Sequence, residues 1–285
     1  MHVILFALNG LLMIALPLVV ATFLARRYRA EWGFFGAGAA TFVAAQVLHI
    51  PFNNFVAGRY LPEVGAGVTV ELFLVAAFYG LSAGIFEEVA RYVTFRRWRT
   101  DARSWAEGLM VGAGHGGIEA LILGLLFVVN MAVLFGVGRG YFRVLVPEGS
   151  VPAVQEQLAQ LLALSWYESI LGGVERAFAI AAHLALSLMV LRAARRKAIG
   201  WLLLAIGWHA AFNSVALIVA AVASPLVVEA VIGIFALVSL LLVYLWRDKE
   251  TGETEHEAAE PARRPDLGME VRDLGEKLDE SRYLD

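Results

Sequence analysis

The sequence contains no cysteine, and only 17% of its 285 residues are charged. The absence of cysteine excludes disulfide bonds, thiolate metal ligands and cysteine nucleophiles, so any metal would have to be bound by histidine and carboxylate groups. The scarcity of charge, together with 59% apolar residues and a mean hydropathy of +0.68, excludes an ordinary water-soluble surface. The composition predicts a protein embedded in the lipid bilayer of a cell membrane, and no nucleic-acid partner is expected.

Seven apolar runs are long enough to cross a hydrocarbon core of about 30 Å, which takes roughly 20 residues of helix. They are Val3–Ala25, Gly33–Ala57, Val68–Ala90, Trp105–Phe135, Ile170–Leu191, Ala198–Ala223 and Pro225–Trp246. Lipid cannot hydrogen-bond a bare backbone, and the runs are not the short alternating segments of a barrel, so each is predicted to be an α-helix. The expected fold is an all-α, polytopic membrane helical bundle over residues 1–247.

Two segments outside these runs are polar. Residues 248–285 carry 13 acidic and 6 basic residues, and we expect them to form an acidic, disordered cytoplasmic tail. Residues 136–169 separate the fourth and fifth runs and contain an amphipathic piece near Val154–Leu164, which is predicted to lie on the outer membrane interface. We find no internal repeat and no separate soluble domain.

Basic residues are distributed unevenly between the two sides of the predicted bundle. Arg59, Arg139 and Arg143 are the three on one side. Twelve follow the first, third and fifth runs on the other side, namely Arg26, Arg27, Arg29, Arg91, Arg96, Arg97, Arg99, Arg103, Arg192, Arg195, Arg196 and Lys197. The positive-inside rule therefore predicts that the N-terminus lies outside and the C-terminus in the cytoplasm. No basic segment precedes the first run, so we interpret it as a retained span and not as a cleaved signal peptide.

Ionisable side chains occur within these runs, although each costs roughly 2.5–3.5 kcal/mol to insert at the centre of a span. The candidates are Glu87, Glu88, His115, Glu119, Glu175, Arg176, His183 and His209, with Asn213 beside them. Four of them, Glu87, His115, His183 and His209, lie nine to twelve residues from a basic residue on the cytoplasmic side, counted from Arg96, Arg103, Arg192 and Lys197 respectively. At 1.5 Å per residue this is roughly 13–18 Å below that surface, so four helices are predicted to place polar groups in one layer. His49 is interpreted as a packing residue.

Spacing along each helix adds direction to this depth, because residues four apart share a face. This spacing relates Glu87 to Arg91, His115 to Glu119, and His209 to Asn213. Each candidate ligand thus has a polar neighbour that could orient it, as metal sites require. Three histidines and a carboxylate suit Zn²⁺, with one position left for a water whose proton a glutamate takes. The glycines at 112–117 are expected to let helices approach closely and not to bind phosphate.

Other interpretations of the same residues stay open at this point. Intramembrane Glu, His and Arg also mark the ion or proton path of a transporter, although the number of runs is odd and repeats are missing. The polar layer could instead lock the packing of a non-catalytic scaffold or immunity protein, and a facing histidine pair could ligate haem. Glu87 and Glu88 fit a cytoplasmic-end pair neutralised by the arginines that follow, and Glu175–Arg176 fits a structural ion pair.

These motifs resemble those of the YhfC family of intramembrane metalloproteases, a branch of the superfamily of type II CAAX prenyl endopeptidases, bacteriocin-processing enzymes and PrsW proteases. The resemblance covers about residues 70–220 and is carried by Phe86–Tyr92, Gly114–Glu119, Glu175–Arg176 with His183, and His209–Asn213. Two residues separate the Glu pair from Arg91, where the CAAX enzymes have three. The second motif holds both His115 and Glu119, where relatives emphasise one of the two.

The resemblance implies a zinc-dependent endopeptidase that cleaves a membrane-associated peptide or protein. It implies Glu87 and Glu88 as candidates for the base that activates water, with Arg91 and Asn213 as further catalytic residues. It also implies that His183 and His209 are the strongest metal ligands, with His115 or Glu119 contributing from the second motif.

Overall fold

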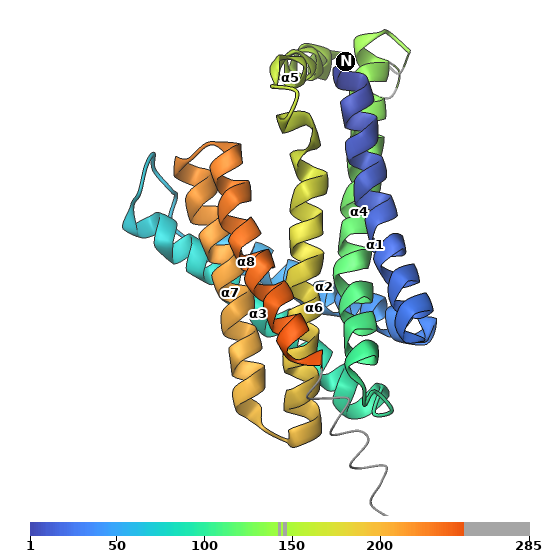
Figure 1. Cartoon of the computed structure of the whole chain (residues 1–285). Helices are drawn as coiled ribbons and strands as arrows, with labels where there is room; N and C mark the ends of the chain where they lie inside the picture. Colours follow the sequence, from blue (N-terminus) through green and yellow to red (C-terminus); the bar gives the residue numbers. More distant parts are fainter. Residues whose placement is uncertain (142–143, 145–146, 248–285) are drawn as a thin grey trace, which may run out of the picture.

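The structure is a computed structural model that describes residues 1–141, 144 and 147–247. Among these residues, seven helices are long and apolar enough to cross a membrane (Figure 1). They are α1 (His2–Tyr28), α2 (Trp32–Tyr60), α3 (Val70–Val93), α4 (Trp105–Gly138), α6 (Leu171–Arg196), α7 (Ile199–Val222) and α8 (Pro225–Leu245). The predicted all-α bundle is therefore confirmed, with each apolar run falling on one of these helices. The predicted acidic tail, residues 248–285, lies outside the described residues.

Local sequence signals set several helix ends. The side chain of Ser104 accepts a hydrogen bond from the backbone of Glu107, whose own side chain returns to the Ser104 backbone, and this capping box starts α4. α3 passes directly into a π-helical turn, η1 (Thr94–Trp98). Arg29 ends α1 and Lys197 ends α6 in the left-handed conformation, so the chain turns sharply within a few residues at both places.

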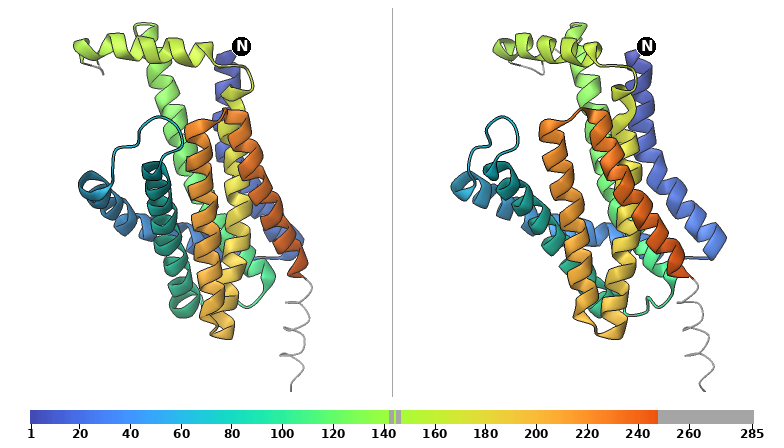
Figure 2. Two further views of the ribbon diagram at one scale, coloured as in Figure 1. Left: turned by 90° about the vertical axis from the view of Figure 1, so that its left-hand side faces the viewer. Right: turned by 60° about the vertical axis from the view of Figure 1, so that its left-hand side comes forward.

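α6 is the central helix of the bundle. In the 18-residue apolar stretch of the span Glu168–Arg196, 89% of the residues are buried inside the protein. The corresponding stretches of the other candidate spans in the described chain are 22–39% buried. It packs against α1, α4, α7 and α8, while α3 packs mainly on α7 (Figures 1 and 2). α2 runs obliquely across the other helices and contacts α3 and α4 (Figure 2). Side chains on α6 can therefore meet those of several other spans.

The predicted amphipathic segment forms the helix α5 (Val151–Ala163). α5 lies across the end of the bundle at which the N-terminus is found, beside the end of α4 (Figures 1 and 2). A helix with one apolar face lying across a bundle end is the arrangement expected at a membrane interface. Which side of the membrane this end faces stays a prediction.

The charge count behind that prediction needs a correction. Arg91 and Arg192 are 0% and 4% exposed, so neither belongs to a basic surface turn as the sequence suggested. Both are drawn into the bundle by partners that the sequence did not reveal, Glu88 for Arg91 and the ring of Trp246 for Arg192. Ten basic residues remain on that side against three on the other, so the direction of the bias is unchanged.

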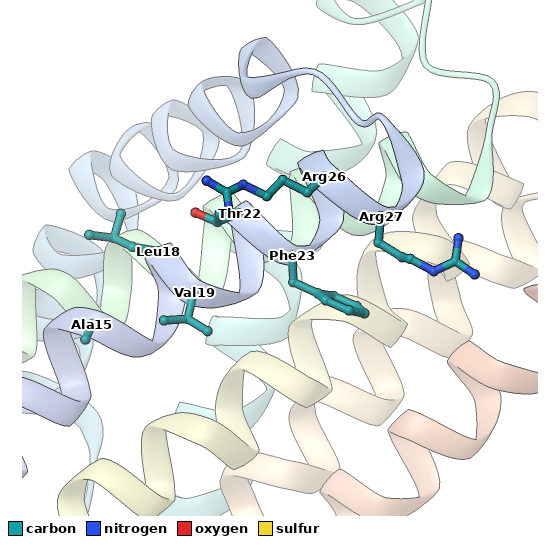
Figure 3. Close-up of a pocket in the computed structure, with 7 residues that line it drawn as sticks. All are labelled: Ala15, Leu18, Val19, Thr22, Phe23, Arg26 and Arg27. Atoms are coloured by element: carbon teal, nitrogen blue, oxygen red, sulfur yellow. The ribbon is translucent and has the colours of Figure 1, made fainter.

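Among the hollows in the described part of the bundle, two differ in character. The outer face of α1 carries a shallow one lined by Ala15, Leu18, Val19, Thr22, Phe23, Arg26 and Arg27 (Figure 3). Its lining holds neither carboxylate nor imidazole, so it offers no group for acid–base or metal chemistry. A second cavity of 1060 Å³ opens within the bundle and is lined by residues of α2, α3, α4, α6, α7 and α8. The chemically active side chains gather on this second cavity.

Candidate metal centre

Glu87 on α3 is the carboxylate at which several helices meet. The residue is 6% exposed, and its side chain lines the large cavity. Its Oε2 accepts a hydrogen bond from His115 Nε2 of α4 at 3.0 Å, and His209 Nε2 of α7 lies 3.9 Å from the same oxygen. Its Oε1 accepts from Gln46 Nε2 of α2 at 3.0 Å. Four spans therefore converge on one carboxylate, and the side chains that were predicted to share a depth do contact one another.

Glu88, the next residue, is fully buried. One of its oxygens accepts from the Arg91 guanidinium, and the other accepts from His209 Nδ1 at 2.8 Å. Arg91 also donates from Nη2 to His183 Nδ1 at 3.1 Å. Glu88 and Arg91 therefore fix the orientation of two imidazoles.

One prediction about these two glutamates is wrong. Arg91 was expected to pair with Glu87 four residues earlier, but it pairs with Glu88, because Glu87 is turned toward α2 and α4. The alternative in which the arginines that follow neutralise both glutamates holds for Glu88, which pairs with Arg91, and not for Glu87, which is bonded to Gln46 and His115.

Glu119 on α4 forms a second polar group at the cavity wall. Its Oε1 accepts from Arg176 Nη1 at 2.6 Å, and its Oε2 accepts from His183 Nε2 at 3.1 Å. Arg176 also forms the expected ion pair with Glu175, whose side chain is 45% exposed. The predicted pairing of Glu119 with His115 is wrong, because Arg176 and His183 occupy both oxygens of Glu119.

Small residues on α4 create the space that His183 occupies. A Cβ added at Gly116 would lie 2.7 Å from His183 Cδ2, and one added at Gly112 would lie 2.7 Å from the His183 carbonyl oxygen. The expectation that this glycine-rich stretch serves close helix contact is therefore confirmed.

Glu87, His183 and His209 form the group that could hold a metal ion. Each is buried and offers a ligand atom, and these atoms all lie within 4.8 Å of one another. Because His209 donates from Nδ1 to Glu88, its Nε2 keeps a lone pair directed toward Glu87. Two imidazoles and a carboxylate, with room in the cavity for water, are the donor set of a catalytic zinc site. The residues present therefore fit such an ion.

The proton positions on His183 restrict how it could serve as a ligand. Its Nδ1 accepts from Arg91, so Nε2 carries the proton that is donated to Glu119. Binding through Nδ1 would keep the bond to Glu119, and it would require the Arg91 Nη2 group to withdraw from this nitrogen. The predicted ligands His115 and Glu119 stand beside the group, bonded to Glu87 and His183 respectively. Asn213 lies one turn after His209 and also lines the cavity; its predicted catalytic role stays a prediction.

Residues on α2 were missed by the sequence reasoning. Gln46 bonds Glu87 directly, His49 Nδ1 lies 3.2 Å from Gln46 Oε1, and Asn53 Nδ2 lies 2.8 Å from His49 Nε2. His49 was interpreted as a hydrogen-bonded packing residue, and it is indeed buried with these bonds, but its link to Glu87 was not foreseen. The missed signal is the spacing of three and then four residues, which places all three polar side chains on one face of an apolar helix.

Comparisons with known proteins agree with this geometry. The sequence profile of the family described as "YhfC intramembrane metalloprotease" matches residues 12–246. A Bacillus subtilis (strain 168) protein named "Uncharacterized membrane protein YhfC" is 38% identical over 218 residues, which cover 74% of this chain and 82% of that protein. No solved structure gives a significant match. With its membrane-spanning helices, the chain is a multi-pass integral membrane protein in contact with the lipid bilayer. The extent of the profile match and the identity to this relative show that the chain belongs to the YhfC intramembrane metalloprotease family.

Proposed function

We propose that the protein is a zinc-dependent intramembrane endopeptidase that hydrolyses a peptide bond of a membrane-associated substrate. The observation that carries the proposal is the meeting of Glu87, His183 and His209 on the wall of a cavity of 1060 Å³. That volume is at the upper end of the range of ligand sites, so a short peptide segment has room beside the polar group. The family to which the chain belongs supports the same conclusion.

A zinc ion, when bound, would supply Lewis acidity that activates a water molecule and polarises the carbonyl of the scissile bond. The side chains of the protein provide the remaining functions. Glu88 and Arg91 hold His209 and His183 in place, and Arg176 holds Glu119. Asn213 on the cavity wall is suited to donate from its amide to the carbonyl oxygen as negative charge develops there.

Two roles fit Glu87, a metal ligand or the general base. Glu88 fits neither, because Arg91 and His209 occupy both of its oxygens and it is 0% exposed. A ligand lost by substitution removes the metal, whereas a base lost by substitution leaves the metal in place and lowers the rate by about 10²–10⁴-fold. The metal content of Glu87→Gln therefore separates the two roles.

The test uses the full chain purified in detergent and reconstituted in liposomes. Zinc content is measured by mass spectrometry, and cleavage is followed by mass spectrometry of synthetic peptides that each contain one apolar segment. We expect zinc close to one per chain, and cleavage that Glu87→Gln and His209→Ala abolish. Glu71→Gln is the matched control, since Glu71 is an exposed carboxylate on the same helix, and it should leave cleavage unchanged.

Failure has two distinguishable forms. A wild-type protein that binds no zinc would remove the metal from the proposal, and cleavage unaffected by Glu87→Gln would remove the site. Flux of protons or ions driven by a pH gradient, in liposomes that show no cleavage, would favour the transporter.

A further inference from the structure

Three polar side chains form a line along the cavity-facing side of α2. Gln46, His49 and Asn53 all line the cavity, and His49 is only 7% exposed. The other residues of α2 between 43 and 52 are all apolar. A polar side chain inside a span is costly, so three on one face need a reason beyond packing.

The hydrogen bonds along this line share one direction, which the charge of Glu87 sets. A carboxylate only accepts, so the Gln46 amide must present its nitrogen to Glu87 and its oxygen to His49. His49 must then carry its proton on Nδ1, which leaves Nε2 to accept from Asn53 Nδ2. The opposite arrangement would place an amide oxygen against the carboxylate. All three donors thus point toward Glu87.

The middle of the line is held at one face of the imidazole ring and at its edge. The His49 ring stacks on Phe86, with ring centres 5.4 Å apart and planes at 27°. Ser82 Oγ of α3 donates to the Tyr79 carbonyl oxygen and lies 3.1 Å from His49 Nε2. Phe86 directly precedes Glu87. The turn of α3 that carries the carboxylate therefore also holds in place the hydrogen-bonded relay formed by Gln46, His49 and Asn53.

We infer that Gln46, His49 and Asn53 are positioning residues that fix the Glu87 carboxylate for metal binding. Gln46 holds Oε1, which leaves Oε2 facing the imidazoles of His115 and His209. His49 and Asn53 hold Gln46 in the orientation that donates. The inference rests on the proposed function, because the relay has this role only if Glu87 acts at the bound metal.

The experiment measures zinc affinity, by competition with a chelator, on full-length variants purified in detergent. Removing a hydrogen-bond partner of a metal ligand typically weakens affinity 10–100-fold. We expect that loss for Gln46→Leu and a smaller one for Asn53→Leu. Asn54→Leu is the control, since Asn54 is an exposed amide on the same helix. The melting temperature of each zinc-free variant is recorded alongside, to show that the bundle is intact.

A matched pair at His49 distinguishes positioning from packing. The amide nitrogen of asparagine can take the place of His Nδ1, so His49→Asn keeps the donor to Gln46, whereas His49→Leu keeps only bulk. We expect His49→Leu to weaken zinc affinity at least 10-fold and to lower kcat more than it raises KM. His49→Asn should recover both values to within about threefold of the wild type.

Each other result would overturn the inference. Suppose that the wild-type protein binds zinc and cleaves, and that Gln46→Leu and His49→Leu bind zinc as tightly as the wild type does. The proposed function would then stand, and the role of the relay would be disproved. Equal losses in His49→Leu and His49→Asn would show that the ring matters only for packing. A wild-type chain without zinc would overturn the relay and the metal-dependent function together.

Discussion

Glu88 and Arg91 form an ion pair in which neither side chain is exposed. Removing one partner of such a pair leaves an uncompensated buried charge, which typically costs about 3–5 kcal/mol. Arg91→Gln should therefore lower the melting temperature of the detergent-purified protein strongly. The variant Glu88→Gln/Arg91→Gln should recover part of the loss, because two neutral amides replace the pair. If the loss of stability in the double variant equalled the sum of the losses in the two single variants, Glu88 and Arg91 would not stabilise each other.

At the same scale, the depth of the side chains could be predicted but their pairing could not. Helix rise placed Glu87, His115, His183 and His209 in one layer, counted from basic residues near the helix ends, although the one used for His183, Arg192, is itself buried. Pairing depends on how each helix is rotated about its axis, and spacing on a single helix does not determine this. Glu87 therefore meets Gln46 and not Arg91, and His115 meets Glu87 and not Glu119.

At the scale of elements, helix rotation is set largely where backbones approach closely. A Cβ at Gly38 of α2 would lie 2.0 Å from the Val111 carbonyl oxygen of α4. Contacts this short fix the crossing of two helices, and they depend on pairs of residues far apart in sequence. The spans themselves were predictable because their length and apolarity are local properties, whereas the line of polar residues on α2 gains meaning only once α2 lies against α3 and α4.

The contact between α4 and α6 gives a prediction at this scale. In Gly116→Ala the new methyl group would lie 2.7 Å from His183 Cδ2, so the imidazole must shift or the helices must separate. We expect a loss of zinc affinity of at least 10-fold and a lower melting temperature. Gly207→Ala on α7 is the control, because nothing lies within 4 Å of its added Cβ. It should match the wild type or be slightly more stable, since Ala exceeds Gly in helix propensity by about 1 kcal/mol. Equal behaviour of the two variants would contradict the close packing of His183 on α4.

At the scale of the whole molecule, the orientation in the membrane that is predicted from charge can be tested with single cysteines. The chain has no cysteine, so each substitution introduces the sole thiol. Gln155 is exposed on α5, beside the end of α4, and Thr100 is exposed just before α4 begins. The 34 residues of α4 separate these places by about 50 Å, so they belong to opposite surfaces. In intact cells, a membrane-impermeant maleimide should label Gln155→Cys at once and Thr100→Cys only after lysis. The opposite pattern would place the ten basic residues of that side outside, against the positive-inside rule, and would invert the predicted topology.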